Sequence, residues 1–188
     1  MKIILASTSP RRKKLLSKTG LVFETKESGY EEEMNLPMSP EELVKHISFN
    51  KAKTVFENNK DAIVIAADTF VVFNGRYIGK PKTEEEARNM LKLLSGQEHE
   101  IITGVTIIGK DKIVSFNSKA KVYMKNLSSE TIDNYIKTGE PLDKAGAYAI
   151  QGKGAILIDK INGDFFGAVG LPIGRLSEEL KAFGINVL

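Results

Sequence analysis

Short apolar runs of strand length alternate along the chain with segments whose apolar residues recur at helical spacing. The strand-like runs cover residues 3–6, 62–67, 69–73, 100–108 and 113–124. Capping serines, a capping threonine and prolines mark the predicted helices, which run from Ser9-Pro10 to near Gly20, from Ser39-Pro40 to about Asn58, from Thr83 to Ser95-Gly96, from Ser128 through Ile136 and from Pro172 through Leu180.

Turn signals decide how these elements combine. Asn74-Gly75 is a strong signal for a type I′ hairpin turn, and the last part of the chain has strand-like runs at 155–160 and 165–169, joined by Asn162-Gly163. Strands that alternate with helices favour an α/β fold, and hairpins require antiparallel pairs as well. We therefore expect an α/β fold with a mixed, twisted sheet flanked by helices and a cleft, built as one domain or two closely joined lobes over residues 1–188.

Composition and charge narrow the possible chemistry. The 188 residues are 41% hydrophobic and 27% charged, which is typical of a globular protein. There is no cysteine and there are two histidines, so disulfides and cysteine-containing zinc sites are excluded, and any metal should be a hard cation held by carboxylates. The net charge of +3 fits anionic substrates, but it equally fits an ordinary protein with exposed lysines.

The first residues argue against a targeting or membrane-spanning segment. The apolar run after Met1 is broken by the polar stretch from Ser7 to Arg12, too early for a secretory leader or a membrane span. We expect a cytoplasmic protein without membrane contact.

The stretch from Ser7 to Arg12 has the features of a phosphate site. Arg11 and Arg12 fall in the first turn of a predicted helix, where a cation is unfavourable by roughly 0.3–1 kcal/mol unless an anion lies nearby. Exposed N–H groups, the hydroxyls of Ser7 and Ser9 and the guanidinium groups could together bind phosphate. Alternatively, both arginines simply point into solvent.

Two further charged residues fall where apolar ones are expected. Lys51 lies in the apolar stripe of its predicted helix, so its side chain either extends to solvent or meets an anion. Asp68 ends the apolar run 62–67, and its carboxylate needs donors, a cation or a raised pKa. It could hold Mg²⁺ or accept a proton from water, or it could be a capping aspartate bonded to nearby N–H groups.

Three more features are weaker in isolation. One glutamate of Glu31–Glu33 could join Asp68 at a magnesium ion, although acidic loops are mostly solvated. Lys80 precedes a proline turn and could be a plain surface lysine. The glycine-studded segment 142–154 allows close backbone approach to a ligand, and Gln151 could read the polar edge of a base, but the segment could also be a structural loop.

Taken together, the motifs resemble those of the Maf family, also called septum formation inhibitor proteins. The resemblance runs from Ile3 to Pro172 and is specific because several separate motifs occur in order. They are LASTSPRR at 5–12, the glutamates at 31–33, KA at 51–52, AADT at 66–69, GKP at 79–81, LSGQEH at 94–99, EPLDKAGAYAIQGKG at 140–154 and VGLP at 169–172.

The resemblance implies a two-lobed fold similar to inosine triphosphate pyrophosphatases and a homodimer. It also implies roles for individual residues. Asp68 matches the catalytic aspartate, Glu32 matches a second acidic residue that holds Mg²⁺ or Mn²⁺ with it, and Ser7 and Ser9 belong to the phosphate loop. The phosphate-binding cations match Arg11, Arg12, Lys51 and Lys80. The positions linked to substrate choice match Arg12, Thr69 and Gln151.

The implied activity is hydrolysis of dTTP, UTP and modified pyrimidine triphosphates to the monophosphate and pyrophosphate, with a role in cell-division arrest. A non-catalytic regulator of septum formation, which binds nucleotide and contacts cell-division proteins, is the alternative. Nucleic-acid binding is not expected, because the sequence has neither interleaved aromatic residues nor a continuous basic stripe.

Overall fold

The computed structural model describes residues 1–188, which divide into two compact units. The first unit comprises residues 1–69, 102–118 and 166–188, and the second comprises 70–101 and 119–165. Hydrogen bonding orders the strands as β2 (Glu24–Lys26), β1 (Lys2–Ala6), β3 (Ala62–Phe73), β5 (Glu98–Ile108), β6 (Ile113–Met124) and β7 (Ile158–Gly163), with β4 (Arg76–Ile78) paired to β3. None of the helices combines the length and the apolar character needed to cross a membrane.

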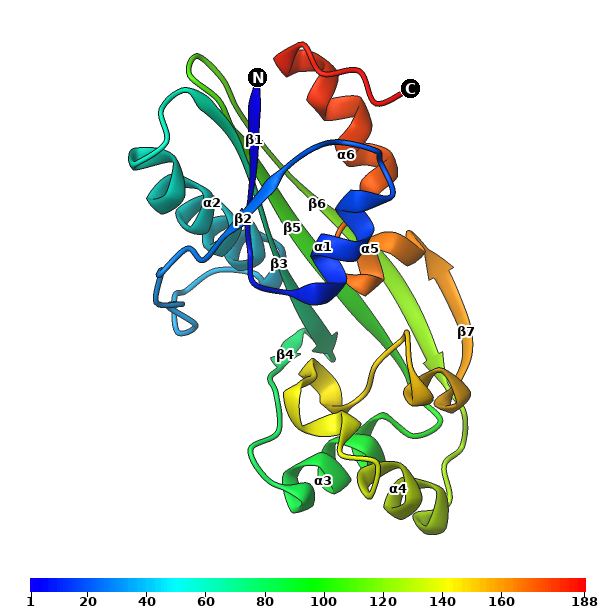
Figure 1. Ribbon diagram of the computed structural model, residues 1–188. Helices are drawn as coiled ribbons and strands as arrows, with labels where there is room; N and C mark the ends of the chain where they lie inside the picture. Colours follow the sequence, from blue (N-terminus) through cyan, green and yellow to red (C-terminus); the bar gives the residue numbers. More distant parts are fainter. The chain divides into compact units, whose positions relative to one another are not determined.

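The first unit is built on parallel strands. β1 (Lys2–Ala6) pairs in parallel with both β2 (Glu24–Lys26) and β3 (Ala62–Phe73), and β1 leads directly into α1 (Figure 1). The first unit also includes parts of β5 (Glu98–Ile108) and β6 (Ile113–Met124). Its helices are α1 (Pro10–Ser17), α2 (Pro40–Glu57), most of α5 (Phe165–Val169), α6 (Ile173–Leu180) and the 3₁₀ helix η4 (Lys181–Phe183).

Helix α2 covers one face of these strands. Its apolar side joins a buried cluster that includes Ile4, Ala52, Val55 and Val64. The helix comes so near the sheet that a Cβ atom at Gly104 would lie 2.5 Å from the carbonyl oxygen of Val44. Only glycine fits at that point of β5, and the close packing fixes the helix, and every side chain on its inner face, against the strands.

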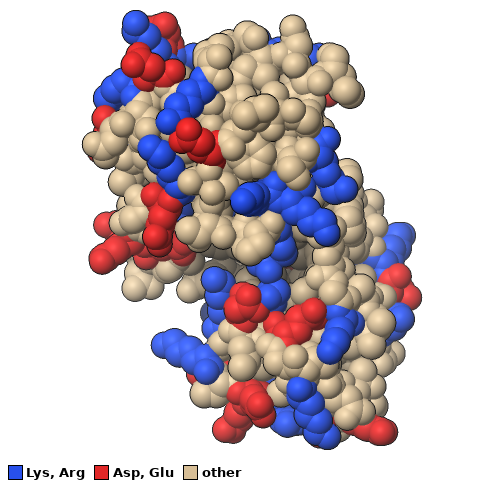
Figure 2. All heavy atoms as spheres, viewed as in Figure 1, with Lys and Arg blue, Asp and Glu red and all other residues tan.

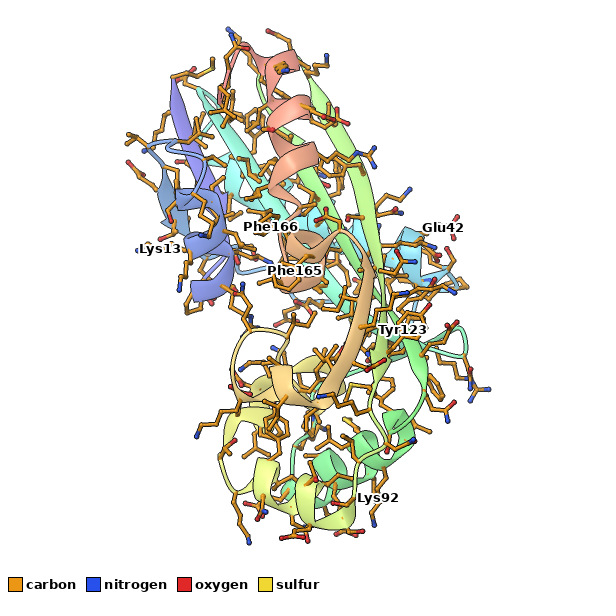
Figure 3. All side chains as sticks on the ribbon, turned by 90° about the vertical axis from the view of Figure 1, so that its right-hand side faces the viewer. Lys13, Glu42, Lys92, Tyr123, Phe165 and Phe166 are labelled. Atoms are coloured by element: carbon orange, nitrogen blue, oxygen red, sulfur yellow. The ribbon has the colours of Figure 1, made fainter.

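The second unit gathers helices around the second-unit parts of β3, β5 and β6. α3 (Glu84–Leu94) packs against α4 (Ser129–Ile136) and the 3₁₀ helices η1 (Glu140–Asp143) and η2 (Ala145–Ala147). The hairpin strand β4 (Arg76–Ile78), the 3₁₀ helix η3 (Lys153–Leu157) and β7 (Ile158–Gly163) complete it. Acidic and basic side chains intermingle over its surface in Figure 2, and Lys92 points outward from α3 in Figure 3.

Most of the predicted elements are confirmed. The mixed sheet flanked by helices is present, Ser39 and Glu42 form the predicted capping box, and Ser9 and Thr83 cap their helices. The Asn74-Gly75 turn joins β3 and β4 with φ values of 51° and 73°, as a type I′ turn requires.

The end of the predicted sheet is wrong in two places. Residues 153–157 form a 3₁₀ helix, so the strand begins only at Ile158 and then runs through Asn162-Gly163, paired antiparallel with β6. Residues 165–169 are helical rather than extended, because Gly170 at φ 125° ends one helical turn by donating its N–H to the carbonyls of Phe166 and Gly167. An apolar run this short fits a strand or a buried turn of helix equally well. The sequence analysis also missed the short, largely exposed strand β2.

Candidate functional site

Two carboxylates and one ammonium group meet in the first unit. Asp68 lies on β3 and Lys51 on the inner face of α2, and Lys51 Nζ lies 2.7 Å from Asp68 Oδ1. The same Nζ lies 2.6 Å from Oε1 of Glu32, in the loop before α2. Lys51 therefore bridges the two acids. These three residues and Arg12 are called the charged cluster below.

Burial makes the pairing necessary. Asp68 is 7% exposed and the side chain of Lys51 is 12% exposed, so neither charge is well solvated. Ionised groups in such positions are tolerated only when they are paired and hydrogen-bonded. Of the alternatives left open by the sequence, Lys51 meets anions rather than extending to solvent, and Asp68 is bonded to a cation rather than only capping local N–H groups.

The Arg12 guanidinium group is held on three sides. Its Nε donates to the carbonyl oxygen of Gly170 at 3.1 Å, Nη1 donates to Ser7 Oγ at 3.4 Å, and Nη2 donates to Thr69 Oγ1 at 3.2 Å. Nη2 also lies 4.0 Å from Asp68 Oδ1. Burial lowers the pKa of Arg12 and the charge of Asp68 acts in the opposite direction, but an arginine stays protonated at any physiological pH.

The start of α1 places Arg12 in this position. Ser9 is the N-cap residue and Pro10 the first helical residue, and Ser7 Oγ accepts the N–H of Ser9 at 3.2 Å. Arg11 is half-buried, and its positive charge acts to lower the pKa of Arg12. A helix start with hydroxyls and two guanidinium groups is suited to bind an anion.

The acids of the charged cluster suit a hard divalent cation. Asp68 and Glu32 supply carboxylate oxygens and converge on one ammonium group, so they are close enough to share a single ion. No group of three or more His, Cys, Asp or Glu side chains is placed to hold a metal. Mg²⁺ commonly binds through one or two carboxylates together with substrate phosphates and water, so this donor set fits it.

In the second unit, the carboxylate of Glu140 accepts hydrogen bonds from the backbone of a loop. Glu140 Oε2 accepts the N–H of Gly154 at 2.8 Å, and Oε1 accepts the N–H of Lys153 at 3.1 Å. The Tyr135 hydroxyl donates to Oε2 at 2.7 Å and accepts the N–H of Ala149 at 3.2 Å. Residues 149–154, called the glycine loop below, are thus fixed near both ends.

The glycines of this loop allow the close approach. A Cβ atom at Gly154 would lie 2.6 Å from Tyr135 Oη, and one at Gly152 would overlap the Glu140 carboxylate. Partial burial acts to raise the pKa of Glu140, but hydrogen bonds from Tyr135, Gly154 and Lys153 prevail and the pKa lies below its ordinary value. The carboxylate therefore stays ionised as the anchor of the loop.

The remaining polar residues of the second unit differ in exposure. Lys80, before Pro81, and Gln151, within the glycine loop, are both exposed. His99 is buried, and its Nε2 lies 2.6 Å from the Tyr148 hydroxyl while Nδ1 has no hydrogen-bond partner. Burial lowers the pKa of His99 to about 4, so its ring is neutral at physiological pH.

Residues 2–183 match the family described as Maf-like protein. The chain belongs to this family. It is 52% identical over 186 residues to a dTTP/UTP pyrophosphatase of Bacillus cereus (strain ATCC 10987 / NRS 248), with 99% of this chain and 92% of that protein covered. A dTTP/UTP pyrophosphatase of Bacillus anthracis (strain CDC 684 / NRRL 3495) is 51% identical, with 99% and 97% covered.

A solved structure supports the fold of this Maf-like chain. The Staphylococcus aureus Ham1 protein superposes with a TM-score of 0.52 over 84% of this chain and 80% of that chain, at 14% sequence identity. At that identity the likeness concerns the fold alone. It agrees with the expected α/β fold.

The structure brings some of the predicted site residues of this Maf-like protein together. Within the first unit, direct contacts link seven of them: Ser7, Ser9, Arg12, Lys51, Glu32, Asp68 and Thr69. Among the three consecutive glutamates, Glu32 is the one whose carboxylate contacts Lys51. Lys80 and Gln151 belong to the second unit.

Sequence reasoning missed the residues that support the site through backbone atoms or hydroxyls. Thr103 contacts Thr69, Gly170 contacts Arg12, and Glu140 and Tyr135 hold the glycine loop. Thr103 and Tyr135 lie in a strand and a helix where each has an ordinary structural explanation. The one available signal was Glu140, an acid directly before Pro141 at the start of the glycine-studded segment.

Proposed function

We propose that this Maf-like protein is a nucleoside triphosphate pyrophosphatase that hydrolyses dTTP and UTP, and modified pyrimidine triphosphates, to the monophosphate and pyrophosphate. The observation that carries the proposal is the convergence of Arg12, Lys51, Glu32 and Asp68 in the charged cluster. The relatives named dTTP/UTP pyrophosphatase, 51–52% identical over nearly the whole chain, supply the substrate class.

The reaction is in-line attack of water on the α-phosphorus. A bond forms between the water oxygen and the α-phosphorus, the bond from that phosphorus to the bridging oxygen of the β-phosphate breaks, and pyrophosphate leaves. Asp68 accepts the proton of the attacking water. Arg11, Arg12, Lys51 and Lys80 stabilise negative charge on the phosphates, and Ser7 and Ser9 contact the same groups.

A divalent metal ion, Mg²⁺ or Mn²⁺, would be held by Asp68 and Glu32. When bound, it would supply Lewis-acid polarisation of the phosphoryl oxygens. The protein's own part is to keep the two carboxylates ionised and close together, which Lys51 does at 2.6 and 2.7 Å. An ammonium group has three N–H donors. Beside its bonds to Glu32 and Asp68, Lys51 can therefore donate a third hydrogen bond to a phosphate oxygen.

The residues proposed to influence substrate choice are Arg12, Thr69 and Gln151. Arg12 and Thr69 are bonded to each other in the first unit, and Gln151 is exposed on the glycine loop of the second. A glutamine amide offers both a donor and an acceptor, and therefore matches the paired donor and acceptor of a uracil or thymine edge.

The test is pyrophosphate release from a panel of triphosphates with Mg²⁺ or Mn²⁺, comparing wild type with Asp68→Asn. We expect turnover of dTTP and UTP, reduced at least about 100-fold in Asp68→Asn. Asp61→Asn is the matched control, because Asp61 is an exposed carboxylate just before the same strand and should leave turnover unchanged. Undiminished turnover in Asp68→Asn would remove the central role of this residue.

The cellular setting is part of the same proposal. We place the protein in the cytoplasm as a homodimer, and we connect triphosphate hydrolysis with arrest of septum formation through cell-division proteins. A regulator that binds nucleotide without catalysis is the alternative. Triphosphate binding with no pyrophosphate release from any nucleotide, and an Asp68→Asn variant that still arrests division, would favour the regulator.

A further inference from the structure

A chain of hydroxyl groups runs from the charged cluster into the core of the first unit. Arg12 Nη2 lies 3.2 Å from Thr69 Oγ1, Thr69 Oγ1 lies 2.9 Å from Thr103 Oγ1, and Thr103 Oγ1 lies 2.7 Å from the carbonyl oxygen of Gly167. Thr103 is fully buried on β5.

The direction of every proton in this chain is fixed by its two ends. A carbonyl oxygen only accepts, so the Thr103 hydroxyl donates to Gly167 and can only accept from Thr69. The guanidinium group only donates, so Thr69 accepts from Arg12 and gives its own proton to Thr103. Thr69 therefore presents a lone pair, and not a proton, to the guanidinium group.

Thr103 also supports the second anchor of Arg12. The carbonyl oxygen of Gly167 accepts both the Thr103 hydroxyl and the N–H of Gly170, at 2.7 and 2.9 Å. The carbonyl oxygen of Gly170 in turn accepts Arg12 Nε at 3.1 Å. Two of the three hydrogen bonds that orient the guanidinium group are thus connected to one buried hydroxyl.

We propose that Thr103 is a positioning residue for the charged cluster: its hydroxyl fixes the Arg12 guanidinium group beside Asp68, through Thr69 on one side and the Gly167–Gly170 turn on the other. The expected effect on turnover rests on the proposed pyrophosphatase function. The expected effect on the order of the Arg12 side chain does not.

The test uses variants that differ by one hydroxyl. Thr103→Val keeps the shape of the side chain and removes the hydroxyl, and Thr103→Ser restores it. The matched control is Thr106→Val, because Thr106 is equally buried on the same strand and bonds to Ser48 and Ser115 instead of the Arg12 network. Both valine variants remove a buried hydroxyl network, so a general loss of stability should affect them alike.

The first readout is hydrogen exchange of the Arg12 Nε–H, observed by nitrogen-15 NMR and assigned by its absence in Arg12→Lys. We expect exchange about tenfold faster in Thr103→Val, and close to wild type in Thr103→Ser and Thr106→Val. Should Thr103→Val not fold, Thr103→Ala removes the same hydroxyl without adding bulk and must reproduce the faster exchange. Wild-type exchange in the folded variant would overturn the proposal.

The second readout is kcat/KM for dTTP and UTP. We expect a loss of about tenfold in Thr103→Val, recovery in Thr103→Ser and no change in Thr106→Val. Equal losses in the two valine variants would show a structural role only and would overturn the proposal. If the wild-type protein releases no pyrophosphate from any triphosphate, the proposed function fails, and the exchange readout alone decides the role of Thr103.

Discussion

The two units organise their polar residues by different means. In the first unit, the charged cluster holds opposite charges at 2.6 and 2.7 Å on a core of parallel strands. In the second unit, a single carboxylate, Glu140, receives a tyrosine hydroxyl and two backbone N–H groups and thereby fixes the glycine loop. The charged cluster pairs opposite charges, whereas Glu140 fixes the backbone conformation of the glycine loop.

The difference predicts how each unit responds to substitution. Removing one member of a buried ion pair leaves an uncompensated charge, and the cost is large. Removing one hydrogen bond to a partly exposed carboxylate lowers the free energy of unfolding only by the net contribution of that bond and the desolvation penalty of the group left unpaired. Substitutions in the charged cluster should therefore have larger effects than substitutions around the glycine loop.

The largest effect is expected from Lys51→Met, which removes the shared ammonium group and leaves Glu32 and Asp68 facing each other. We expect a loss of about 3 kcal/mol in the free energy of unfolding, at the low end for a buried pair because the Glu32 side chain is 42% exposed. Turnover of dTTP and UTP should fall about 100-fold. Urea denaturation and pyrophosphate release measure the two losses.

The control for Lys51→Met is Lys53→Met, because Lys53 is exposed on the same helix. Its free energy of unfolding should stay within about 0.5 kcal/mol of wild type. Equal losses in both variants would mean that the charge balance of the cluster contributes nothing specific.

The stability of the second unit should respond to pH through His99. Its folded pKa of about 4 lies below the unfolded value of about 6.5, so as the pH falls the unfolded chain binds the proton first. The stability contributed by neutral His99 is complete above pH 6.5 or so, and about 3 kcal/mol is lost as the pH falls towards 4.

Urea denaturation between pH 7 and pH 4 tests this, with His99→Gln and His46→Gln as the pair of variants. The pH dependence between about 6.5 and 4 should weaken in His99→Gln and persist in His46→Gln. The reverse pattern would assign the titration to the first unit and contradict the role of the buried imidazole.

Charge and periodicity made the cluster of the first unit predictable. Lys51 was out of place on an apolar helical stripe and Asp68 was out of place in an apolar strand, and the structure pairs these two residues. A charged residue at a position expected to be buried indicates that an oppositely charged or hydrogen-bonding partner lies beside it in the fold, because an unpaired buried charge is unfavourable. The resemblance to the Maf family then implied a role for each of these residues.

The supporting residues could not be predicted in the same way. Thr103, Tyr135 and Glu140 act on backbone carbonyls, backbone N–H groups or other hydroxyls, and every residue of a chain carries such backbone groups. The helix at 165–169 was missed for a related reason, since its one turn depends on the backbone of Gly170 rather than on a side-chain pattern.

A smaller effect is expected when the anchor of the glycine loop is altered. Glu140→Gln keeps one acceptor oxygen but replaces the other by an NH₂ group, which cannot accept a backbone N–H. Local stability of the loop should fall by about 2 kcal/mol, seen as roughly 30-fold faster amide exchange at Lys153 and Gly154. Glu98→Gln, at an exposed position of the same unit, should leave both amides unchanged.

The smallest effect, from Tyr135→Phe, separates the two ends of the glycine loop. The variant removes the hydroxyl that accepts the N–H of Ala149, but the N–H groups of Lys153 and Gly154 still donate to Glu140. Amide exchange should therefore accelerate at Ala149 by about fivefold, equivalent to about 1 kcal/mol, and much less at Gly154. Equal acceleration at both amides would mean that the loop opens as one unit, with Tyr135 and Glu140 forming a single anchor rather than two.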